Sequence, residues 1–448
     1  ESRGLGDVYK RQTGDANLTT KENLKLDTGD FADVTMTSNN GSVEVSNLIS
    51  SNNVVINSEN GKTTINTANV TGNLTTDTNE LEVLNKLTVA GTSNLTTAGA
   101  LTLETGEFAG VTISSGSAEI TSMKSTGEAN LTTTGDLTVG TGNFAKVTMT
   151  SNNGSVGVST LTSSNNVAIN SENGKTTLGT LNVDGTFGVV TKNLEITTGM
   201  DVGGKATITS TGDVVVTPDV TLSDLEITSA KDVTFGKLKV SNVASITNEG
   251  KLTLGAGEFA DITINSDSAD ITKITATGTS NLTTTGALTL GTGEFKDITI
   301  TSDSADITKI TATGISNLTT TGALTLGTGD FVEVTISSGS AEITSMKSTG
   351  DANLTTTGAL NLGTGDFAKV TMTSNNGSVE VSNLTSSNNV AINSNNGKTT
   401  LGTLNVDGTF DVVTKDLEIT TGMNVDGKVT ITATGDINIS PDVIFSDL

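Results

Sequence analysis

The sequence contains no cysteine, no histidine and no tryptophan, and only two of its 448 residues are proline. Without cysteine, the chain can form neither disulfides nor thiolate metal sites. Without cysteine and histidine together, it can build neither a Ser-His-Asp triad nor a Cys-His pair. Aromatic residues make up 3% of the chain and hydrophobic residues 33%, less than several globular cores would use. These absences argue against a conventional globular enzyme.

Positive charge is also scarce, since 24 Lys and Arg stand against 49 Asp and Glu, a formal net charge of -25 at pH 7. A surface of this sign repels phosphate groups, so we expect neither nucleic acid nor an anionic membrane as a partner. No apolar run approaches the length of a transmembrane helix, and no membrane span is expected. The few apolar residues are nevertheless regularly placed, which argues against a disordered chain.

The first twelve residues differ in composition from all the others. Residues 1–12 hold the only arginines, the only tyrosine and the only glutamine of the chain. They resemble a translated sequencing-adapter scar of the kind seen in metagenomic assemblies; a short native peptide is the alternative. We therefore expect a non-native or disordered segment that packs loosely and does not extend the repeats. The chain shows no initiator Met and no signal peptide, and we expect an internal fragment of a longer protein.

Internal repeats dominate residues 13–448, for which we predict one continuous domain. A longer repeat is superimposed on a short one, because residues 87–225 recur with few changes as residues 310–448. Near-identity over that range indicates duplication of a whole block. The short repeat is the motif G-[DE]-F, which recurs in steps of 36 residues at Phe259, Phe295, Phe331 and Phe367, and Phe108 and Phe144 show the same step.

Each 36-residue repeat contains short apolar pairs with threonine between them, which is the period of a half-buried strand. Gly, Asn, Asp and Ser separate the pairs and favour turns. The inward residues are predicted to form two stacks. One consists of Leu252/Leu254, Ile271/Ile274, Leu288/Leu290, Ile307/Ile310 and Leu324/Leu326, and the other of Ile262/Ile264, Leu282, Ile298/Ile300, Leu318 and Val334/Ile336.

Short strands at a fixed step of about 18 residues are best explained by a chain that winds into coils. Each strand can then pair in parallel with the equivalent strand of the next coil. Parallel crossovers are right-handed. The sequence therefore predicts an all-β fold, a single-stranded parallel right-handed β-helix (β-solenoid) with coils of about 18 residues paired into 36-residue repeats. Residues 153–225 and 376–448 lose the 36-residue step, so coil lengths should vary there. The recurring Phe is interpreted as a corner filler rather than an exposed row.

No pattern predicts a catalytic, cofactor or metal site, and we expect no enzyme. Acidic positions repeat with the coil, as at Glu258 and Glu294, whereas an active site needs one unrepeated cluster. There is neither an EF-hand loop nor a glycine-rich calcium nonapeptide. The pair Asp267/Asp270 recurs as Asp303/Asp306, so calcium remains a weak alternative to solvated acidic turns.

The positions that alternate with the inward residues of the second stack are mostly threonine. Such a T-x-T ladder resembles the ice-binding face of solenoidal antifreeze proteins. The alternative, which we favour, is an ordinary exposed face rich in a β-branched residue. The candidate face consists of Thr283, Thr285, Thr299, Thr301, Thr319, Thr321, Thr335, Thr355, Thr357, Thr371 and Thr373.

The segment from Asn353 to Asp366, NLTTTGALNLGTGD, resembles filamentous-haemagglutinin-type exoproteins and autotransporter passengers. The resemblance covers residues 13–448 through composition and repeat texture. It implies a right-handed β-helix that is secreted or exported to a bacterial cell surface and acts as an adhesin or structural stalk. Its partners would be glycans or proteins of host or neighbouring cells. Two other functions stay open: a surface-layer or filament component, and an ice-binding solenoid with ice as its ligand.

Overall fold

The computed structural model describes residues 10–11, 14–440 and 443–447, and all regular structure among them is β-strand. The chain divides into two units, Glu1–Lys231 (unit 1) and Asp232–Leu448 (unit 2), and each is a parallel β-solenoid. The predicted all-β solenoid fold is therefore confirmed. That residues 13–448 form one continuous solenoid stays a prediction. Within the described residues, no helix is present that could cross a membrane.

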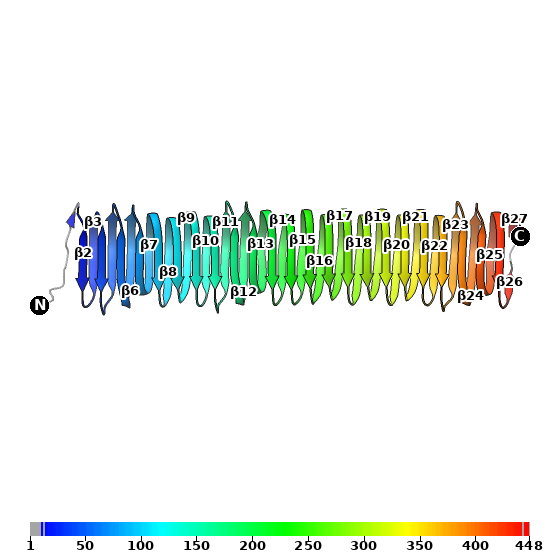
Figure 1. Cartoon of the computed structure of the whole chain (residues 1–448), viewed down its shortest axis with the longest axis horizontal. Coiled ribbons are helices and arrows are strands. Elements are labelled where there is room, and N and C mark those ends of the chain that lie inside the picture. The colour runs from blue at the N-terminus through cyan, green and yellow to red at the C-terminus, as the bar shows by residue number, and fades with distance from the viewer. Residues whose placement is uncertain (1–9, 12–13, 441–442, 448) are drawn as a thin grey trace. The chain divides into compact units, whose positions relative to one another are not determined.

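In unit 1 the strands follow one another along the solenoid in chain order, and each pairs with its equivalent in the next coil, as β3 does with β5 (Figure 1). They are β1 (Lys10–Arg11), β2 (Ala16–Thr20), β3 (Leu24–Phe31), β4 (Val34–Ser38), β5 (Val43–Ser50), β6 (Val54–Val70), β7 (Leu74–Thr97), β8 (Ala100–Ser115), β9 (Ser117–Thr133), β10 (Leu137–Ser151), β11 (Val156–Ser163), β12 (Val167–Val183), β13 (Phe187–Ser210) and β14 (Val214–Ser229).

Unit 2 is arranged in the same way (Figure 1). Its strands are β15 (Val233–Asn248), β16 (Lys251–Ser266), β17 (Ser268–Thr284), β18 (Ala287–Ser302), β19 (Ser304–Thr320), β20 (Ala323–Ser338), β21 (Ser340–Thr356), β22 (Leu360–Ser374), β23 (Val379–Ser386), β24 (Val390–Val406), β25 (Phe410–Ala433), β26 (Ile437–Ile439) and β27 (Val443–Asp447).

The step from one coil to the next is not constant. Leu252 pairs with Ala269, a step of 17, and Ala269 pairs with Leu288, a step of 19. These two steps together make the 36-residue repeat. In the irregular region Val379 pairs with Thr399, a step of 20. The predicted variation of coil length after residue 376 is therefore confirmed.

Each regular coil of unit 2 contains three short segments, named here from the coil of β16. The first segment is 252–254, the second is 257–259 and the third is 262–266, and alternate residues of each are buried. A register shift between Phe259 and Ile262 separates the second segment from the third. The inward residues are even-numbered in the first segment, odd-numbered in the second and even-numbered again in the third, so inward and outward positions exchange at each junction between segments.

The second segments fill the core by alternating large and small residues from coil to coil. Phe259 pairs with Ala276, and Ala276 pairs with Phe295. Two residues earlier, Gly257 pairs with Ile274, and Ile274 pairs with Gly293. The glycine is required because the Phe ring lies over it: a Cβ on Gly293 would lie 2.4 Å from Cε2 of Phe295. A coil that contributes Gly and Phe thus packs against one that contributes Ile and Ala.

The recurring Phe residues are buried, since Phe259 and Phe295 are each 4% exposed and Phe331 is 1% exposed. The interpretation of Phe as a corner filler is confirmed. Full burial of a side chain of this size stabilises a coil by about 1.5–3 kcal/mol. The same alternation of volume occurs in the third segments, where Ile262 pairs with Ser280 and Ser280 with Ile298.

The inward residues agree with the predicted stacks in the third segment and differ in the first. Leu254 pairs with Ile271, as a stack requires, but Leu252 pairs with Ala269. Ile274 belongs to the second segment, opposite Gly257. The pairing of Ile271 with Ile274 in one stack is therefore wrong. The error has a physical cause. One of the two inward positions of the second segment is glycine in every other coil, so a search for pairs of apolar residues does not detect this segment as a separate strand.

Asn and Asp side chains at the corners bind the backbone of the next coil. Oδ1 of Asp33 accepts the backbone N–H of Asn53 at 2.9 Å, and Oδ1 of Asn53 accepts that of Asn73 at 3.0 Å. Oδ1 of Asn73 in turn accepts the N–H of Thr92 at 2.8 Å. A corner leaves backbone donors outside the strand ladder, and these side chains satisfy them. The turns are thus held by hydrogen bonds between coils, as the strands are.

The segment 1–12 was expected not to extend the coil ladder. Lys10 and Arg11 form β1, which pairs in parallel with Gly29 and Asp30 of β3. Lys10 thus stands one ordinary coil step before Gly29, so for these two residues the expectation is wrong. The remaining residues of the segment lie outside the described residues. The predicted non-native origin concerns where the segment came from and stays a prediction.

Candidate interaction face

Outward residues of the third segments form two rows over seven consecutive coils of unit 2, which we call the Thr/Asn face. Side chains one coil apart lie about 4.8 Å apart along each row. The first row is Thr263, Asn281, Thr299, Asn317, Thr335, Asn353 and Thr371, and the second is Asn265, Thr283, Thr301, Thr319, Ser337, Thr355 and Thr373.

All fourteen positions of this face are uncharged, in a chain of net charge -25. None of these residues is buried, and Thr299, Thr301 and Thr319 are exposed. The face therefore presents hydroxyl, methyl and amide groups only. In unit 1 a shorter version is present, in which Thr112 pairs with Asn130 and Asn130 with Thr148.

Three of the predicted threonines do not belong to this face. Thr285, Thr321 and Thr357 follow the third segment and lie in bends. The Thr285 hydroxyl donates to Oδ1 of Asp267 at 2.7 Å, and the Thr321 hydroxyl to Oδ1 of Asp303 at 2.5 Å. These threonines stabilise the turns, and the predicted T-x-T pairs that contain them are corrected. The aligned partners in the first row are Asn281, Asn317 and Asn353, which the search for threonine missed.

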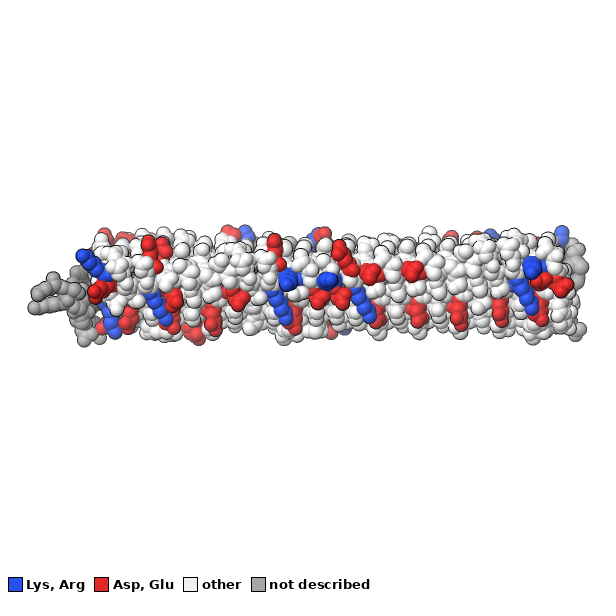
Figure 2. All heavy atoms as spheres, turned by 90° about the horizontal axis from the view of Figure 1, so that it is seen from below, with Lys and Arg blue, Asp and Glu red and all other residues white. Residues whose placement is uncertain are grey.

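Charged residues lie on the first and second segments, and the acidic ones alternate with neutral ones. On the second segments Glu258 pairs with Thr275, and Thr275 with Glu294. On the first segments the acidic residues occur in the other set of coils, at Asp270 and Asp306. Figure 2 shows acidic side chains spaced in rows with uncharged surface between them. Acidic groups in one row thus lie two coils, about 9.6 Å, apart, which is close to the Debye length at physiological salt.

Lysines lie beside several of these acidic residues. Lys239 lies 3.3 Å from Glu258, and Lys251 lies 3.1 Å from Asp270. The four side chains are 47–54% exposed, so each pair contributes at most about 1 kcal/mol. Their main effect is to neutralise repulsion between stacked coils.

Shallow hollows recur where the second segment meets the third. One of about 310 Å³ is bordered by Glu258, Phe259 and Thr277, and the next, of about 520 Å³, by Thr277, Glu294 and Phe295. A hollow of the same composition lies at Glu107 and Phe108 in unit 1. Because the hollows repeat with the coils, they do not form a single distinct binding site.

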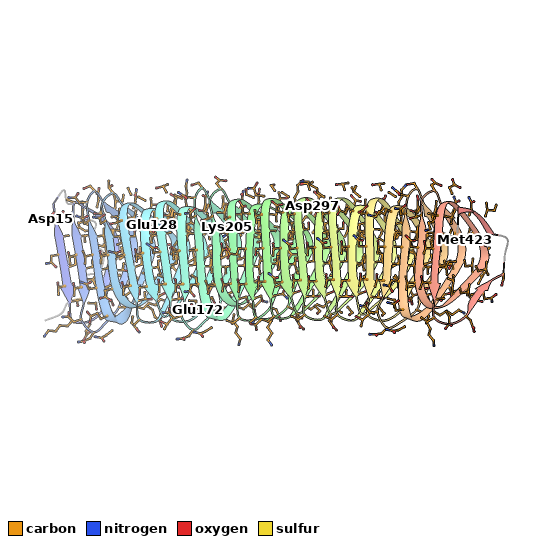
Figure 3. All side chains as sticks on the ribbon, turned by 45° about the vertical axis from the view of Figure 1, so that its right-hand side comes forward. Asp15, Glu128, Glu172, Lys205, Asp297 and Met423 are labelled. Carbon is orange, nitrogen blue, oxygen red and sulfur yellow. The ribbon has the colours of Figure 1, made fainter. Side chains whose placement is uncertain are left out.

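Among residues 10–11, 14–440 and 443–447, no group of three or more acidic residues is placed to hold a metal ion. Asp267 and Asp303, weighed above for calcium, accept hydrogen bonds from the next coil. In Figure 3 the side chains of Glu128 and Asp297 belong to separate coils, as do those of the other labelled residues. Each unit is a repetitive parallel β-solenoid, and unit 2 carries the uncharged Thr/Asn face.

Compared with models of known protein families, with curated proteins and with solved structures, the chain has no match.

Proposed function

We propose that this chain is a non-catalytic protein, secreted or carried on a bacterial cell surface, that acts as an adhesin or structural stalk. The observation that supports this best is the repetition of its outward surface. In unit 2 the Thr/Asn face, the acidic rows and the hollows recur every two coils. A surface of this kind suits many equal, weak contacts, whose combined affinity exceeds that of any one. Its partners would be glycans or proteins of host or neighbouring cells.

Deletion of whole repeats tests the proposal. Removing residues 287–322 takes out one 36-residue repeat, which is two whole coils, and joins Gly286 to Ala323 in the original register. Removing residues 323–358 takes out the next two coils. If contacts are distributed, beads coated with either variant should detach from cultured epithelial cells at similar and slightly lower shear than the full chain.

The result that contradicts the proposal is a complete loss of attachment for one deletion and none for the other. That difference would reveal a localised site in the deleted coils. Circular dichroism of both variants, showing unchanged strand content, is the control for folding.

The uncharged Thr/Asn face favours a second candidate, an ice-binding solenoid. Replacing Thr301, Thr319 and Thr355 by Lys places three charges within the second row. An ice binder should show thermal hysteresis that this triple variant loses. The matched control is the same change at outward residues of the first segments, Thr253, Thr289 and Thr325. We expect the full chain to show no hysteresis, and the first triple variant to attach to cells as the full chain does.

A further inference from the structure

The chain contains six Asn-Gly dipeptides, arranged as three pairs of the same kind. The first Asn of each pair lies in a bend between two strands, and we call these residues the bend sites. The second Asn follows 20 residues later, one coil on and within the bounds of a long strand, and we call these residues the strand sites. The bend sites are Asn40, Asn153 and Asn376, and the strand sites are Asn60 in β6, Asn173 in β12 and Asn396 in β24.

At the strand sites the side-chain amide is held by the preceding coil. Nδ2 of Asn173 donates to the backbone carbonyl of Asn152 at 2.8 Å. The glycine that follows is confined as well, because a Cβ on Gly174 would collide with the carbonyl oxygen of Gly154. The side chain of a strand site can therefore turn toward the next backbone nitrogen only after it loses this hydrogen bond. The equivalent bonds join Asn60 to Asn39 at 3.1 Å and Asn396 to Asn375 at 2.8 Å.

At the bend sites the backbone is held and the side chain is not. The backbone N–H of Asn153 donates to the carbonyl of Thr134 at 2.8 Å, and the N–H of Gly154 donates to Oγ of Ser151 at 3.0 Å. The residue Asn153 is exposed, and among the residues that the structure describes its carboxamide has no hydrogen-bond partner. A carboxamide that is free to rotate thus lies beside a backbone nitrogen in a fixed position.

We propose that the three bend sites are modification sites, at which the folded chain converts asparagine to aspartate and isoaspartate without an enzyme, while the strand sites are protected. At residue 153 the backbone nitrogen of Gly154 attacks Cγ of Asn153. The N–Cγ bond forms, the Cγ–Nδ2 bond breaks, and ammonia leaves with the proton of the attacking N–H. Water then opens the resulting succinimide at either of its carbonyl groups. Glycine favours the attack because it has no Cβ beside the attacking nitrogen.

Each conversion changes its corner in two ways. It adds a carboxylate to a chain of net charge -25, and at residue 153 this happens beside Asp136, whose Oδ1 accepts the N–H of Ser155 at 2.8 Å. Isoaspartate also lengthens the main chain by one atom at a point where the carbonyl of Gly154 accepts the hydroxyl of Ser171 of the next coil at 2.9 Å. The chain therefore accumulates altered corners as it ages, whatever it binds.

Ageing of the full chain in mildly alkaline buffer tests the proposal. After digestion, mass spectrometry locates each converted asparagine, and chromatography separates aspartate from isoaspartate peptides. We expect the bend sites to convert at least tenfold faster than the strand sites in all three pairs. The control is the same chain unfolded in urea, where all six Asn-Gly dipeptides should convert at similar rates because the fold no longer distinguishes them.

A matched pair of variants checks the site at residue 153. In Asn153→Gln the attack would need a larger ring, so isoelectric focusing of the aged variant should show two more acidic forms where the unmodified chain shows three. Asn173→Gln should leave all three. Equal rates at bend and strand sites of the folded chain would overturn the proposal, and so would bend sites that convert only in urea. Neither readout depends on attachment to cells.

Discussion

At the scale of the residue, the core depends on matched volumes in neighbouring coils. Gly293 leaves room for the ring of Phe295. In the preceding coil the large and small residues are reversed, because Ile274 lies opposite Gly293 and Ala276 lies opposite Phe295. Protein interiors are packed like crystals, so a misplaced methyl group is not absorbed. The glycines of the G-[DE]-F motif are therefore packing residues rather than turn residues.

Gly293→Ala should consequently destabilise unit 2. The new Cβ would lie 2.4 Å from Cε2 of a ring that is 4% exposed, and overpacking of this kind costs about 1–3 kcal/mol. Urea unfolding followed by circular dichroism measures the loss. Gly422→Ala is the matched control, since no atom lies within 4 Å of its added Cβ. Equal unfolding curves for both variants would disprove the packing role.

Asp33 ties the pH dependence of the N-terminal coils to a hydrogen-bond network. The backbone N–H of Asn53 and the side-chain amide of Asn52 donate to its carboxylate, and together they lower the pKa of Asp33. The folded state thus binds the proton more weakly than the unfolded state. The stabilisation is present above the unfolded pKa of about 3.9 and is lost as the pH falls through the lower, folded value.

We therefore expect the protection of amides near Asn53, measured as the intrinsic exchange rate at each pH divided by the observed rate, to fall at pH 3 and below in the unmodified chain. In Asp33→Asn this protection should already be reduced at pH 7, and it should change less between pH 5 and pH 3. A variant whose pH profile matches that of the unmodified chain would contradict the assignment to Asp33.

At the scale of the element, each strand is stabilised by the coils directly above and below it. Leu324 is 1% exposed and pairs with Ala305 on one side and Ala341 on the other. Leu324→Asp should bury an unpaired carboxylate at a cost of several kcal/mol. Because solenoid stability is a sum of nearest-neighbour terms, exchange should rise most in β19 to β21 and little in β16. Uniform exchange throughout unit 2 would refute this.

The sequence predicted which residues form strands more accurately than it predicted which residues of neighbouring coils pair with one another. Leu288, Leu290, Ile298 and Ile300 point inward as the period of two requires. Thr285 was placed in the outward face because its spacing from Thr283 is correct, yet the strand ends at Thr284. The coil step differs between the regular and the irregular coils, and a single extra residue in a turn exchanges inward and outward positions. Spacing alone cannot locate that residue.

At the scale of the whole molecule, repulsion between like charges is the main contribution that the sequence predicts to destabilise the folded state. A net charge of -25 raises the free energy of the folded chain through self-repulsion. Increasing the ionic strength from about 0.01 M to about 1 M shortens the Debye length from about 30 Å to about 3 Å. The melting temperature should rise with NaCl, and rise less in a variant carrying Glu258→Gln, Glu294→Gln and Asp330→Asn. A melting temperature that falls with salt would show that the ion pairs outweigh the repulsion.

The alternation of Gly-Phe coils with Ile-Ala coils has a consequence for how such a chain can change its length. Residues 13–20 and 126–133 are near-copies, and six coil steps separate Leu24 from Leu137, which follow them. Six is even, so the copied block returns the same kind of coil to the same place. A copied block with an odd number of coils would stack two Gly-Phe coils on each other, with Phe facing Phe and glycine facing glycine. In the regular coils of unit 2, where the two kinds of coil alternate, we therefore expect variants of different length to differ by pairs of coils.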